Sequence, residues 1–569
     1  MESFYKVREF STVREMLDQS FELFHDRNAF EIKDKDSNFR YIKYSEYERK
    51  INGLITALIY GGYGGKKIAI CADNCYEYCM TYLSVICAGS VIVPIDKELK
   101  TPDIRGIIDV SDCEVLVCDR KFLDAHGKDT FSDMRLLLLR KPEDEYGDIE
   151  SFDDFVREGI ELNNAGKRLY LDVKQDPEKL CTLLFTSGTT GVSKGVMLCQ
   201  RNFVFEIRSA MGVVKIYPED CGISMLPLHH TFESSIMIFF AVYCGAKVTF
   251  CEGFKYVLRN MKEFNPSVFV AVPLLLETVH KRIMKAVRQK KNGLKLMKAG
   301  MAVCKAASKV NIDLRKVFFR EIQETFGGNM RLIICGGAPI DPQIIKDFDA
   351  FGIQIIFGYG LTECAPLAII NHDRLHSTDS VGKPLPGTQA VILNPDENGI
   401  GELCVKGDMV MLGYYKNKEA TDEVIDKNGF FHTGDLAFID KKGNYHITGR
   451  CKNVIVTLNG KNIYPEELEY HLAQSDFVSS CMVEGVDDDR GDLVIRAQIF
   501  PDKTEIKEFL DKEPTREEIK AIIKKVVDNV NNSVPGFKRI KSFLVRENDF
   551  VMTTTQKIKR TANSTVKKK

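Results

Sequence analysis

The stretch KKIAICADNCYEYCMTYLSVICAGSVIVPID, from Lys66 to Asp96, decides the fold class. It opens with a short apolar run, continues with an apolar segment of helical length, and closes with a second apolar run rich in β-branched residues. A strand, a helix and a second strand in this order predict a βαβ unit, whose parallel strands are covered by helices. The run CEVLVCD, at 113–119, has the pattern of a further strand.

Similar short apolar runs, separated by helical patterns, recur along most of the chain, in GAKVTFCEG, PSVFVAVP, MRLIICGG and IQIIFGYG. From about Val381 the apolar runs shorten and turn residues become frequent, which indicates a small antiparallel β subdomain. The 569 residues exceed the ~250–300 that one hydrophobic core supports. We therefore predict an α/β protein with two domains. Residues 1–450 form a large domain of βαβ sheets that includes a β-rich subdomain at about 381–450, and residues 451–569 form a small, mobile α+β domain.

One helix of the C-terminal region is predicted in detail. Thr515 and Glu518 have the spacing of a capping box, in which the side chain of each residue accepts a hydrogen bond from the backbone N–H of the other. Apolar residues then recur at helical spacing, which predicts a buried face. They are Ile519, Ile522, Ile523, Val526, Val527 and Val530.

Composition narrows the class of protein. Hydrophobic residues make up 44% of the chain, charged residues 28%, and the net charge is −1, so nothing global indicates nucleic-acid binding. The charged N-terminus lacks a secretory signal, the cysteines number seventeen, and no apolar stretch reaches the ~18–20 residues of a membrane span. We expect a cytoplasmic protein with reduced thiols. Cys71, Cys75 and Cys79 follow each other at intervals of four residues, which predicts that they share one helix face. They are either core residues or metal ligands, and their apolar surroundings favour the core.

The glycine-rich stretch LLFTSGTTGVSKGVML, residues 183–198, is suited to phosphate but is no Walker A loop. Ser193 stands where the second glycine of that motif belongs, and the GVMLC that follows Lys194 has the pattern of a strand rather than a helix. We predict a hairpin whose backbone N–H groups, hydroxyls and lysine hold phosphate; the alternative is a surface hairpin without a ligand. The predicted phosphate-binding residues are Thr186, Ser187, Gly188, Thr189, Thr190 and Lys194.

TSGTTGVSKG resembles the phosphate loop of the adenylate-forming superfamily, which includes acyl-CoA synthetases, luciferases and the adenylation domains of peptide synthetases. Six further segments resemble the family's other motifs, in the family's order and over essentially the whole chain. They are LPLHHTFE (226–233), GGAP (336–339), YGLTE (359–363), HTGDL (432–436), GRCKNVIVTLNGKNIYPEELE (449–469) and TTTQKIKR (553–560).

The resemblance implies roles for the residues of these motifs. Tyr359 stacks on adenine, Thr362 reaches the α-phosphate region, and Glu363 holds Mg²⁺, a hard cation that prefers oxygen ligands. His230 lies on the side of the acyl carboxylate, although His229 beside it leaves a structural role for either ring open. The implied nucleotide-binding residues of this part of the chain are Gly336, Gly337, Ala338, Pro339, Tyr359 and Gly360.

The later motifs are implied to serve ribose binding and domain motion. Asp435 accepts hydrogen bonds from the ribose hydroxyls, and Arg450 contacts the ribose or a phosphate. Lys452 is the hinge about which the C-terminal domain rotates between two half-reactions. Gly460 lines the tunnel for the thiol, and Lys557 is the catalytic lysine that reaches the transferring phosphate. The chain departs from the family pattern in Asn453, where an acidic residue is common, and in Thr555 and Gln556.

The resemblance implies a reaction in which ATP and an acid give acyl-AMP and pyrophosphate, after which CoA takes the acyl group. About sixty residues separate Pro273 from Gly336, an insertion similar to that of the long-chain fatty acid branch. Residues 281–320 contain thirteen Lys or Arg and one acidic residue. Leu294, Met297, Met301 and Cys304 form an apolar helical stripe there, among Lys295, Lys298, Lys305 and Lys309. The segment either contacts an anionic membrane on the cytoplasmic side or packs its stripe under a solvated basic face.

Three other functions stay open at this point. An acyl-AMP ligase would load a phosphopantetheinyl acyl carrier protein instead of CoA. An ATP hydrolase using the glycine loop would release ADP and orthophosphate rather than AMP and pyrophosphate. A binding or membrane-tethering protein without catalysis is disfavoured, because Glu363, Asp435 and Lys557 are all present.

Overall fold

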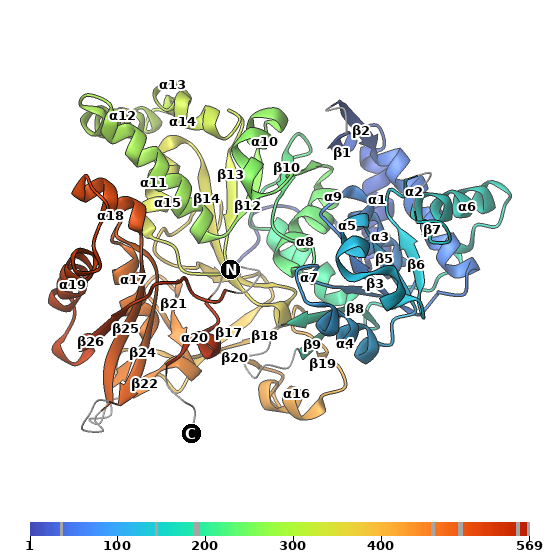
Figure 1. Cartoon of the computed structure of the whole chain (residues 1–569). Coiled ribbons are helices and arrows are strands. Elements are labelled where there is room, and N and C mark those ends of the chain that lie inside the picture. Colours follow the sequence, from blue (N-terminus) through green and yellow to red (C-terminus); the bar gives the residue numbers. More distant parts are fainter. Residues whose placement is uncertain are drawn as a thin grey trace. The chain divides into compact units, whose positions relative to one another are not determined.

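The structure is a computed structural model that describes residues 1–34, 38–142, 146–186, 194–456, 461–487, 493–552 and 558–565. The chain divides into two compact units. The first unit contains residues 1–390 and 405–431, and the second contains 391–404 and 432–569. Figure 1 labels the elements of both units. The domain boundary and the hinge at Lys452 stay predictions.

The quoted stretch forms the predicted βαβ unit. Strand β3 (Lys67–Cys71) leads through helix α3 (Tyr76–Cys87) to β4 (Val91–Pro94), and β3 and β4 pair in parallel. They lie within an eight-stranded sheet of order β19-β9-β8-β4-β3-β5-β6-β7. The other strands are β5 (Val115–Cys118), β6 (Arg135–Leu138), β7 (Glu150–Ser151), β8 (Leu180–Thr186), β9 (Lys194–Cys199) and β19 (Gly413–Tyr414).

The later βαβ repeats build a second sheet of nine strands, in the order β16-β15-β14-β13-β12-β10-β11-β1-β2. Its central strands β14, β13, β12, β10, β11 and β1 pair in parallel, so their carboxyl ends lie along one edge. The strands are β1 (Asn28–Lys33), β2 (Phe39–Lys43), β10 (Cys221–Ser224), β11 (Lys247–Phe250), β12 (Val268–Ala271), β13 (Leu332–Cys335), β14 (Gln354–Gly360), β15 (Leu367–Ile370) and β16 (Lys383–Pro384).

Helices of the first unit connect and cover these strands. They are α1 (Val13–Phe24), α2 (Tyr44–Tyr60), α4 (Thr101–Ser111), α5 (Arg120–His126), α6 (Phe152–Asn164), α7 (Gln200–Met211), α8 (Thr231–Ser234), the π-helix η3 (Ser235–Phe240), α9 (Ala241–Cys244), α10 (Val257–Phe264), α11 (Pro273–Gln289), α12 (Gly293–Ser308), α13 (Arg315–Phe318), α14 (Arg320–Thr325), α15 (Pro342–Phe351) and α16 (Lys418–Val424). Within the described residues, every helix is too short or too polar to cross a bilayer.

The insertion between Pro273 and Gly336 forms helices α11–α14, drawn in green to yellow-green in Figure 1. Cys304 on α12 is buried, and Met297 and Met301 are half-buried, but Leu294, the fourth residue of the predicted stripe, is exposed in the first turn of the helix. Another set of apolar side chains of the insertion is exposed. Its members are Leu296, Val303, Val310, Val317 and Phe318.

The second unit contains a four-stranded sheet, β17-β18-β20-β21, and a three-stranded sheet, β24-β25-β26. The predicted helix is α19 (Arg516–Ser533); the capping box of Thr515 and Glu518 is present and its six predicted apolar residues are buried. The remaining elements are β17 (Gln389–Leu393), β18 (Gly401–Lys406), β20 (Phe431–Ile439), β21 (Tyr445–Arg450), β22 (Ile455–Val456), β23 (Asn462–Ile463), α17 (Pro465–Ala473), β24 (Val478–Asp487), β25 (Leu493–Pro501), α18 (Lys503–Leu510), β26 (Ser542–Val545) and α20 (Arg560–Asn563).

One prediction about the cysteines is wrong. Cys71 ends strand β3, Cys75 precedes helix α3 as its N-cap, and only Cys79 lies inside the helix, so the three share no helix face. All three are buried, as expected of core residues. The four-residue spacing misled because the chain changes from strand to helix within it.

Candidate active site

Three predicted motifs of the first unit follow strands whose carboxyl ends share one edge of the nine-stranded sheet. LPLHHTFE follows β10, GGAP follows β13, and YGLTE begins in the last two residues of β14. A β-carbon built on Gly336 would lie 3.2 Å from the carbonyl oxygen of Gly358 and 3.6 Å from the Phe232 ring. The three motifs, spread over more than a hundred residues of sequence, therefore come together where α/β sheets bind ligands.

The YGLTE segment is folded tightly against the residues after it. A β-carbon on Gly360 would lie 2.1 Å from the carbonyl oxygen of Pro366, and Leu361 N–H donates to the same oxygen at 2.7 Å. Only glycine allows this approach. The turn leads into a 3₁₀ turn at Thr362–Cys364, so Thr362 and Glu363 are placed on a closed backbone loop.

Tyr414 holds the predicted magnesium carboxylate and was missed by the sequence analysis. Its hydroxyl donates to Glu363 Oε1 at 2.9 Å, and Met411 N–H donates to the Glu363 carbonyl oxygen at 2.9 Å. Burial, followed by the charge of Glu363, raises the pKa of Tyr414, so the hydroxyl keeps its proton and remains a donor. The sequence signal was the GYY segment, 413–415, whose first two residues form strand β19.

Lys194 stands next to the same tyrosine. The glycine-rich stretch forms the predicted hairpin, with β8 antiparallel to β9 and Thr186 opposite Lys194. Strand β19 pairs with the other side of β9, and Lys194 Nζ lies 4.7 Å from the centre of the Tyr414 ring. The structure thus brings Lys194, Tyr414 and Glu363 together. Ser187, Gly188, Thr189 and Thr190 lie outside the described residues.

The two histidines of LPLHHTFE are both half-buried and lie ring to ring. The side chain of His229 is 11% exposed, and burial, aided by the charge of Lys97, lowers its pKa to about 3, so the ring is neutral. His230 is half-buried, and the two ring centroids are 4.2 Å apart. His229 and His230 are both half-buried, so burial does not separate them, and the place of His230 on the carboxylate side stays a prediction.

Two polar side chains, the half-buried Asn74 and the buried Glu233, fix the backbone of this histidine segment. Asn74 Nδ2 donates to the Leu226 carbonyl oxygen at 2.7 Å, and its Oδ1 accepts from Leu228 N–H at 3.1 Å. Glu233 accepts from Met225 N–H at 2.9 Å. Burial raises the pKa of Glu233 to about 8, so this carboxyl group is protonated at neutral pH. The histidines are therefore held on a polar but uncharged support.

In the second unit, the predicted ribose carboxylate is paired with a cation. Asp435 on β20 and Arg450 on β21 are direct partners across the strands, and Arg450 Nε lies 2.7 Å from Asp435 Oδ1. The Asp435 side chain is 6% exposed and that of Arg450 is 52% exposed. The arginine orients this buried carboxylate, which suits an acceptor for sugar hydroxyls. The two residues were predicted separately; their pairing was not.

Lys452 is exposed and lies in a short 3₁₀ turn, Cys451–Asn453. The next residue, Asn453, donates through Nδ2 to Glu466 Oε1 of helix α17 at 2.6 Å. The predicted hinge residue is thus followed by one that is fastened to a helix. Gly460 lies outside the described residues.

Lys557 also lies outside the described residues, but both flanks of its motif are anchored. Met552 and Ile558 form an antiparallel bridge. Arg560 contacts both carboxylate oxygens of Glu469 at 2.6 Å and donates to the Val483 carbonyl oxygen at 2.9 Å. Burial raises the pKa of Glu469 to about 7, against the opposing charge of Arg560. These contacts fasten the last residue of the motif to α17 and β24.

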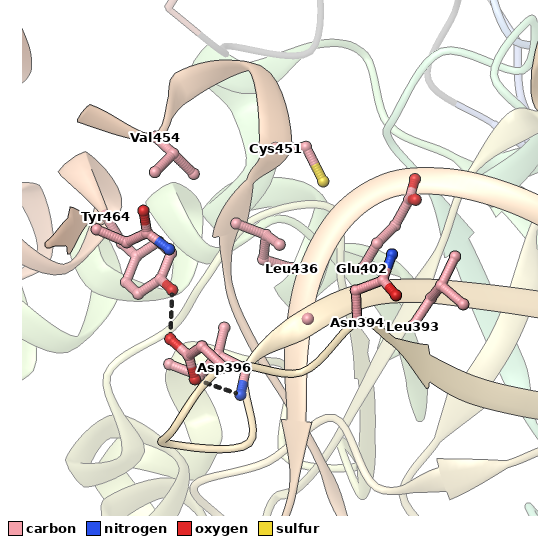
Figure 2. Close-up of a pocket in the computed structure, with 11 residues that line it drawn as sticks. Leu393, Asn394, Asp396, Glu402, Leu436, Cys451, Val454 and Tyr464 are labelled. Carbon is pink, nitrogen blue, oxygen red and sulfur yellow. Dashed lines mark hydrogen bonds between the residues drawn. The ribbon is translucent and has the colours of Figure 1, made fainter. Parts of the chain in front are cut away.

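A cavity of about 250 Å³ lies in the second unit and contains none of the predicted site residues. Its lining includes Glu402, Leu436, Cys451 and Tyr464, and Tyr464 donates to Asp396 at 3.2 Å across it (Figure 2). Leu436 follows Asp435 on β20, and successive strand residues face opposite sides. The cavity therefore lies behind the strand that carries the predicted ribose carboxylate.

A lysine and a tyrosine-held carboxylate beside a hairpin, with further loops at the carboxyl edge of a parallel sheet, form an arrangement suited to a nucleotide-binding α/β protein. The model of the AMP-binding enzyme family matches residues 17–415, and that of the AMP-binding enzyme C-terminal domain matches residues 452–569. The chain belongs to the AMP-binding enzyme family.

Individual relatives agree with this assignment. The chain is 28% identical over 577 residues to long-chain-fatty-acid–CoA ligase 5 of Rattus norvegicus, a match that covers 92% of this chain and 82% of the relative. It is 26% identical to a chloroplastic long-chain-fatty-acid–[acyl-carrier-protein] ligase, AEE15, of Arabidopsis thaliana, over 90% of this chain and 79% of the relative. A crystal structure of the anthranilate CoA ligase AuaEII with anthranoyl-AMP shares the fold, with a TM-score of 0.74, 20% identity and coverage of 97% and 96%.

Proposed function

We propose that this protein activates a long- or medium-chain fatty acid with ATP and transfers the acyl group to CoA. In the first step a carboxylate oxygen attacks the α-phosphorus of ATP, and the bond to pyrophosphate breaks. In the second step the CoA sulfur attacks the acyl carbonyl carbon, AMP leaves, and the thiol proton is released. The arrangement of Lys194, Tyr414 and Glu363 at a glycine-rich hairpin carries the proposal, because it suits triphosphate binding without the helix of a P-loop.

The residues of the first unit neutralise charge where it accumulates. Lys194 supplies a cation close to the hairpin that we propose for the phosphates, and Thr362 supplies a hydroxyl next to Glu363. The donor set fits Mg²⁺, because Glu363 offers a carboxylate oriented by Tyr414 and oxygen is the ligand that this ion prefers. When bound, Mg²⁺ would offset negative charge on the phosphate oxygens.

The residues of the second unit are assigned to the sugar and to the reacting phosphate. The Asp435 carboxylate, oriented by Arg450, would accept the ribose hydroxyls. Lys557 would stabilise the charge that develops as the acid attacks, and its withdrawal about Lys452 would admit the thiol to the site. Gly460 is assigned to the path of the thiol.

The choice of acid is supported by the likeness to long-chain ligases and by the insertion at α11–α14. The test is a panel of acids with purified protein, ATP and Mg²⁺, read as pyrophosphate release. Palmitate with CoA should give palmitoyl-CoA, AMP and pyrophosphate. Activity restricted to short, aromatic or amino acids would reject the chain length, and release of ADP with orthophosphate would identify a hydrolase instead.

A carrier protein as acceptor is the second candidate, favoured by the likeness to an acyl-carrier-protein ligase. The two acceptors are separated by supplying preformed acyl-AMP with either CoA or a phosphopantetheinylated carrier protein. Faster transfer to CoA supports the main proposal. Transfer to the carrier protein alone would replace it.

We further propose that the protein is cytoplasmic and contacts an anionic membrane through residues 281–320. The exposed apolar side chains Leu296, Val303 and Val310 follow at seven-residue intervals from α12 onward, in a segment with thirteen basic residues. Basic residues attract anionic lipids and exposed apolar side chains insert between them. A membrane-dissolved fatty acid would then be close to the enzyme.

The membrane contact is tested by sedimentation with vesicles of phosphatidylcholine, with and without phosphatidylglycerol. We expect binding to the anionic vesicles that weakens with salt. The triple variant Leu296→Ser, Val303→Ser, Val310→Ser should bind less, whereas Phe509→Ser, which changes an exposed apolar residue of α18, should bind as the wild type does. Equal binding by all three proteins would contradict the assignment to this segment.

A further inference from the structure

Three side chains with metal-binding atoms meet in the second unit, apart from the proposed magnesium site. Glu402 and Cys404 are two residues apart on β18, so their side chains share a face of the sheet. His432 lies on β20, the neighbouring strand. One ligand atom of each residue lies within 4.8 Å of those of the other two.

The distances within this cluster are close to those that a tetrahedral ion requires. His432 Nδ1 lies 3.6 Å from Cys404 Sγ and 3.0 Å from Glu402 Oε2. Bonds of about 2.1 Å to nitrogen or oxygen and about 2.3 Å to sulfur around Zn²⁺ separate nitrogen from sulfur by about 3.6 Å and from oxygen by about 3.4 Å. A shift of the carboxylate by a few tenths of an ångström would complete the geometry.

The chemistry of the three donors selects the type of ion. A thiolate and an imidazole with one carboxylate suit Zn²⁺ or Co²⁺, whereas Mg²⁺ prefers oxygen alone. The cluster therefore differs in kind from Glu363, whose described contacts are a tyrosine hydroxyl and a backbone N–H.

Neighbouring residues orient the three side chains, and the adjacent cavity gives an ion access to them. Gly434 N–H donates to Glu402 Oε1 at 3.1 Å, which leaves Oε2 directed at His432. Such outer contacts orient metal ligands. Cys404 is buried, while Glu402 is half-buried and lines the 250 Å³ cavity, where Figure 2 shows its carboxylate at one side. An ion could reach the cluster from this cavity.

We propose that Glu402, Cys404 and His432 form a binding site for a thiophilic divalent cation of the Zn²⁺ type. The ion would take one carboxylate oxygen, the thiolate sulfur and Nδ1 of the imidazole, with water in the fourth position. The Cys404 thiol loses its proton on binding, and the imidazole keeps a single proton on Nε2. The bound ion would join β18 to β20 three residues before Asp435 on the same strand.

The test uses Co²⁺ as a spectroscopic probe on the full-length protein after treatment with a chelator. Binding at this site should produce a thiolate-to-cobalt charge-transfer band and the intense visible bands of tetrahedral Co²⁺, saturating at one ion per chain. Zn²⁺ added afterwards should abolish both signals. Absence of a charge-transfer band at saturating Co²⁺ would overturn the proposal.

Variants assign the signal to the cluster. Cys404→Ser should lose the charge-transfer band. Cys451→Ser is the matched control and should keep it, because Cys451 is the exposed cysteine and lines the same cavity. The opposite result would place the ion on Cys451 and refute the site. If Cys404→Ser fails to fold, Glu402→Gln decides: it keeps an acceptor for Gly434 and should weaken Co²⁺ affinity roughly tenfold or more, whereas unchanged affinity refutes the proposal.

Discussion

The two units support their predicted nucleotide-site residues in different ways. In the first unit, GGAP, YGLTE and the histidine segment are remote in sequence and meet because parallel strands end at one edge of a sheet. In the second, Asp435 and Arg450 are cross-strand partners on a single hairpin, and the motif of Lys557 is fastened by an ion pair and a β-bridge. The first unit offers a prepared binding surface, and the second holds single side chains by local contacts. Changes in the first unit should therefore affect nucleotide binding or folding, and changes in the second should separate the two half-reactions.

The largest effect is expected for Lys557→Ala. Loss of a cation that meets the transition state typically costs on the order of 3–4 kcal/mol, so acyl-AMP formation should fall roughly 10²- to 10³-fold. Thioester formation from supplied acyl-AMP should change only a few-fold. Pyrophosphate release measures the first step, and consumption of synthetic acyl-AMP with CoA measures the second.

The control for that variant is Lys559→Ala. Lys559 is an exposed lysine two residues away, and its described hydrogen bonds use the backbone. It should retain both half-reactions. An equal loss of both steps in Lys557→Ala would mean that this lysine is structural and that the contrast between the units does not hold.

Glu233→Gln should remove a pH dependence of stability that belongs to the first unit. The pKa of Glu233 is about 8 in the folded protein and about 4.5 when unfolded, so the folded state holds a proton that the unfolded state releases. Its contribution is fully present below pH 4.5 and is lost as pH rises through 8. Between pH 6 and 8.5 we expect wild type to lose on the order of 3 kcal/mol relative to the variant.

Urea unfolding followed by far-ultraviolet circular dichroism measures this difference, since the chain has no tryptophan. The comparison of the two proteins cancels the titration of all other groups. Parallel pH profiles would show that Glu233 is ionised in the fold, and the histidine segment would then rest on a charged support.

Tyr414→Phe tests the prepared surface of the first unit. The variant loses the hydroxyl that donates to Glu363, and a hydrogen bond to a charged group contributes about 1.5–3 kcal/mol. We expect roughly a tenfold higher Mg²⁺ concentration for half-maximal pyrophosphate release, with little change in thioester formation from acyl-AMP. Tyr415→Phe, at the neighbouring tyrosine whose hydroxyl lies 3.4 Å from Asp112, should behave as wild type. An unchanged Mg²⁺ dependence in Tyr414→Phe would remove Glu363 from the magnesium site.

The smallest effect is expected for Asn453→Asp, next to the predicted hinge. The new carboxylate would face Glu466, to which Asn453 now donates at 2.6 Å, and like charges at this distance repel. The ratio of thioester formation to adenylation should change by about two- to fivefold, because the lost contact is local and close to solvent. Both rates are measured as for Lys557→Ala. A ratio equal to that of wild type would show that this contact does not influence the balance between the two steps.

Local patterns predicted much of this fold. The βαβ unit at Lys66–Asp96, the hairpin at the glycine-rich stretch and the capped helix α19 depend on spacing and on turn or cap residues, which are read within one segment. Contacts between segments that are distant in sequence cannot be predicted from the pattern of any one segment. Tyr414 and Glu363 are 51 residues apart, and their hydrogen bond exists because β19 pairs with β9.

Helix α12 shows that periodicity predicts an apolar face but not what covers it. Periodicity indicated an apolar stripe with Met297, Met301 and Cys304, but could not decide whether it faces protein or membrane. The structure turns the Cys304 side inward and leaves Leu294 exposed. A β-carbon built on Gly300, between Met297 and Cys304, would lie 3.4 Å from the rings of Phe318 and Phe319, so residues at the end of the next helix determine how this side packs.

The distribution of thiols has a practical consequence. All seventeen cysteines lie within the described residues, and Cys451, directly before the predicted hinge lysine, is the exposed one. A maleimide dye should therefore react at this position in preference to the other thiols, and faster as the pH rises, because burial raises the pKa of the Cys451 thiol. The natural sequence thus carries its own attachment point for a fluorescent reporter of the rotation that we propose about Lys452, and this proposed movement can be tested during turnover without engineering a label.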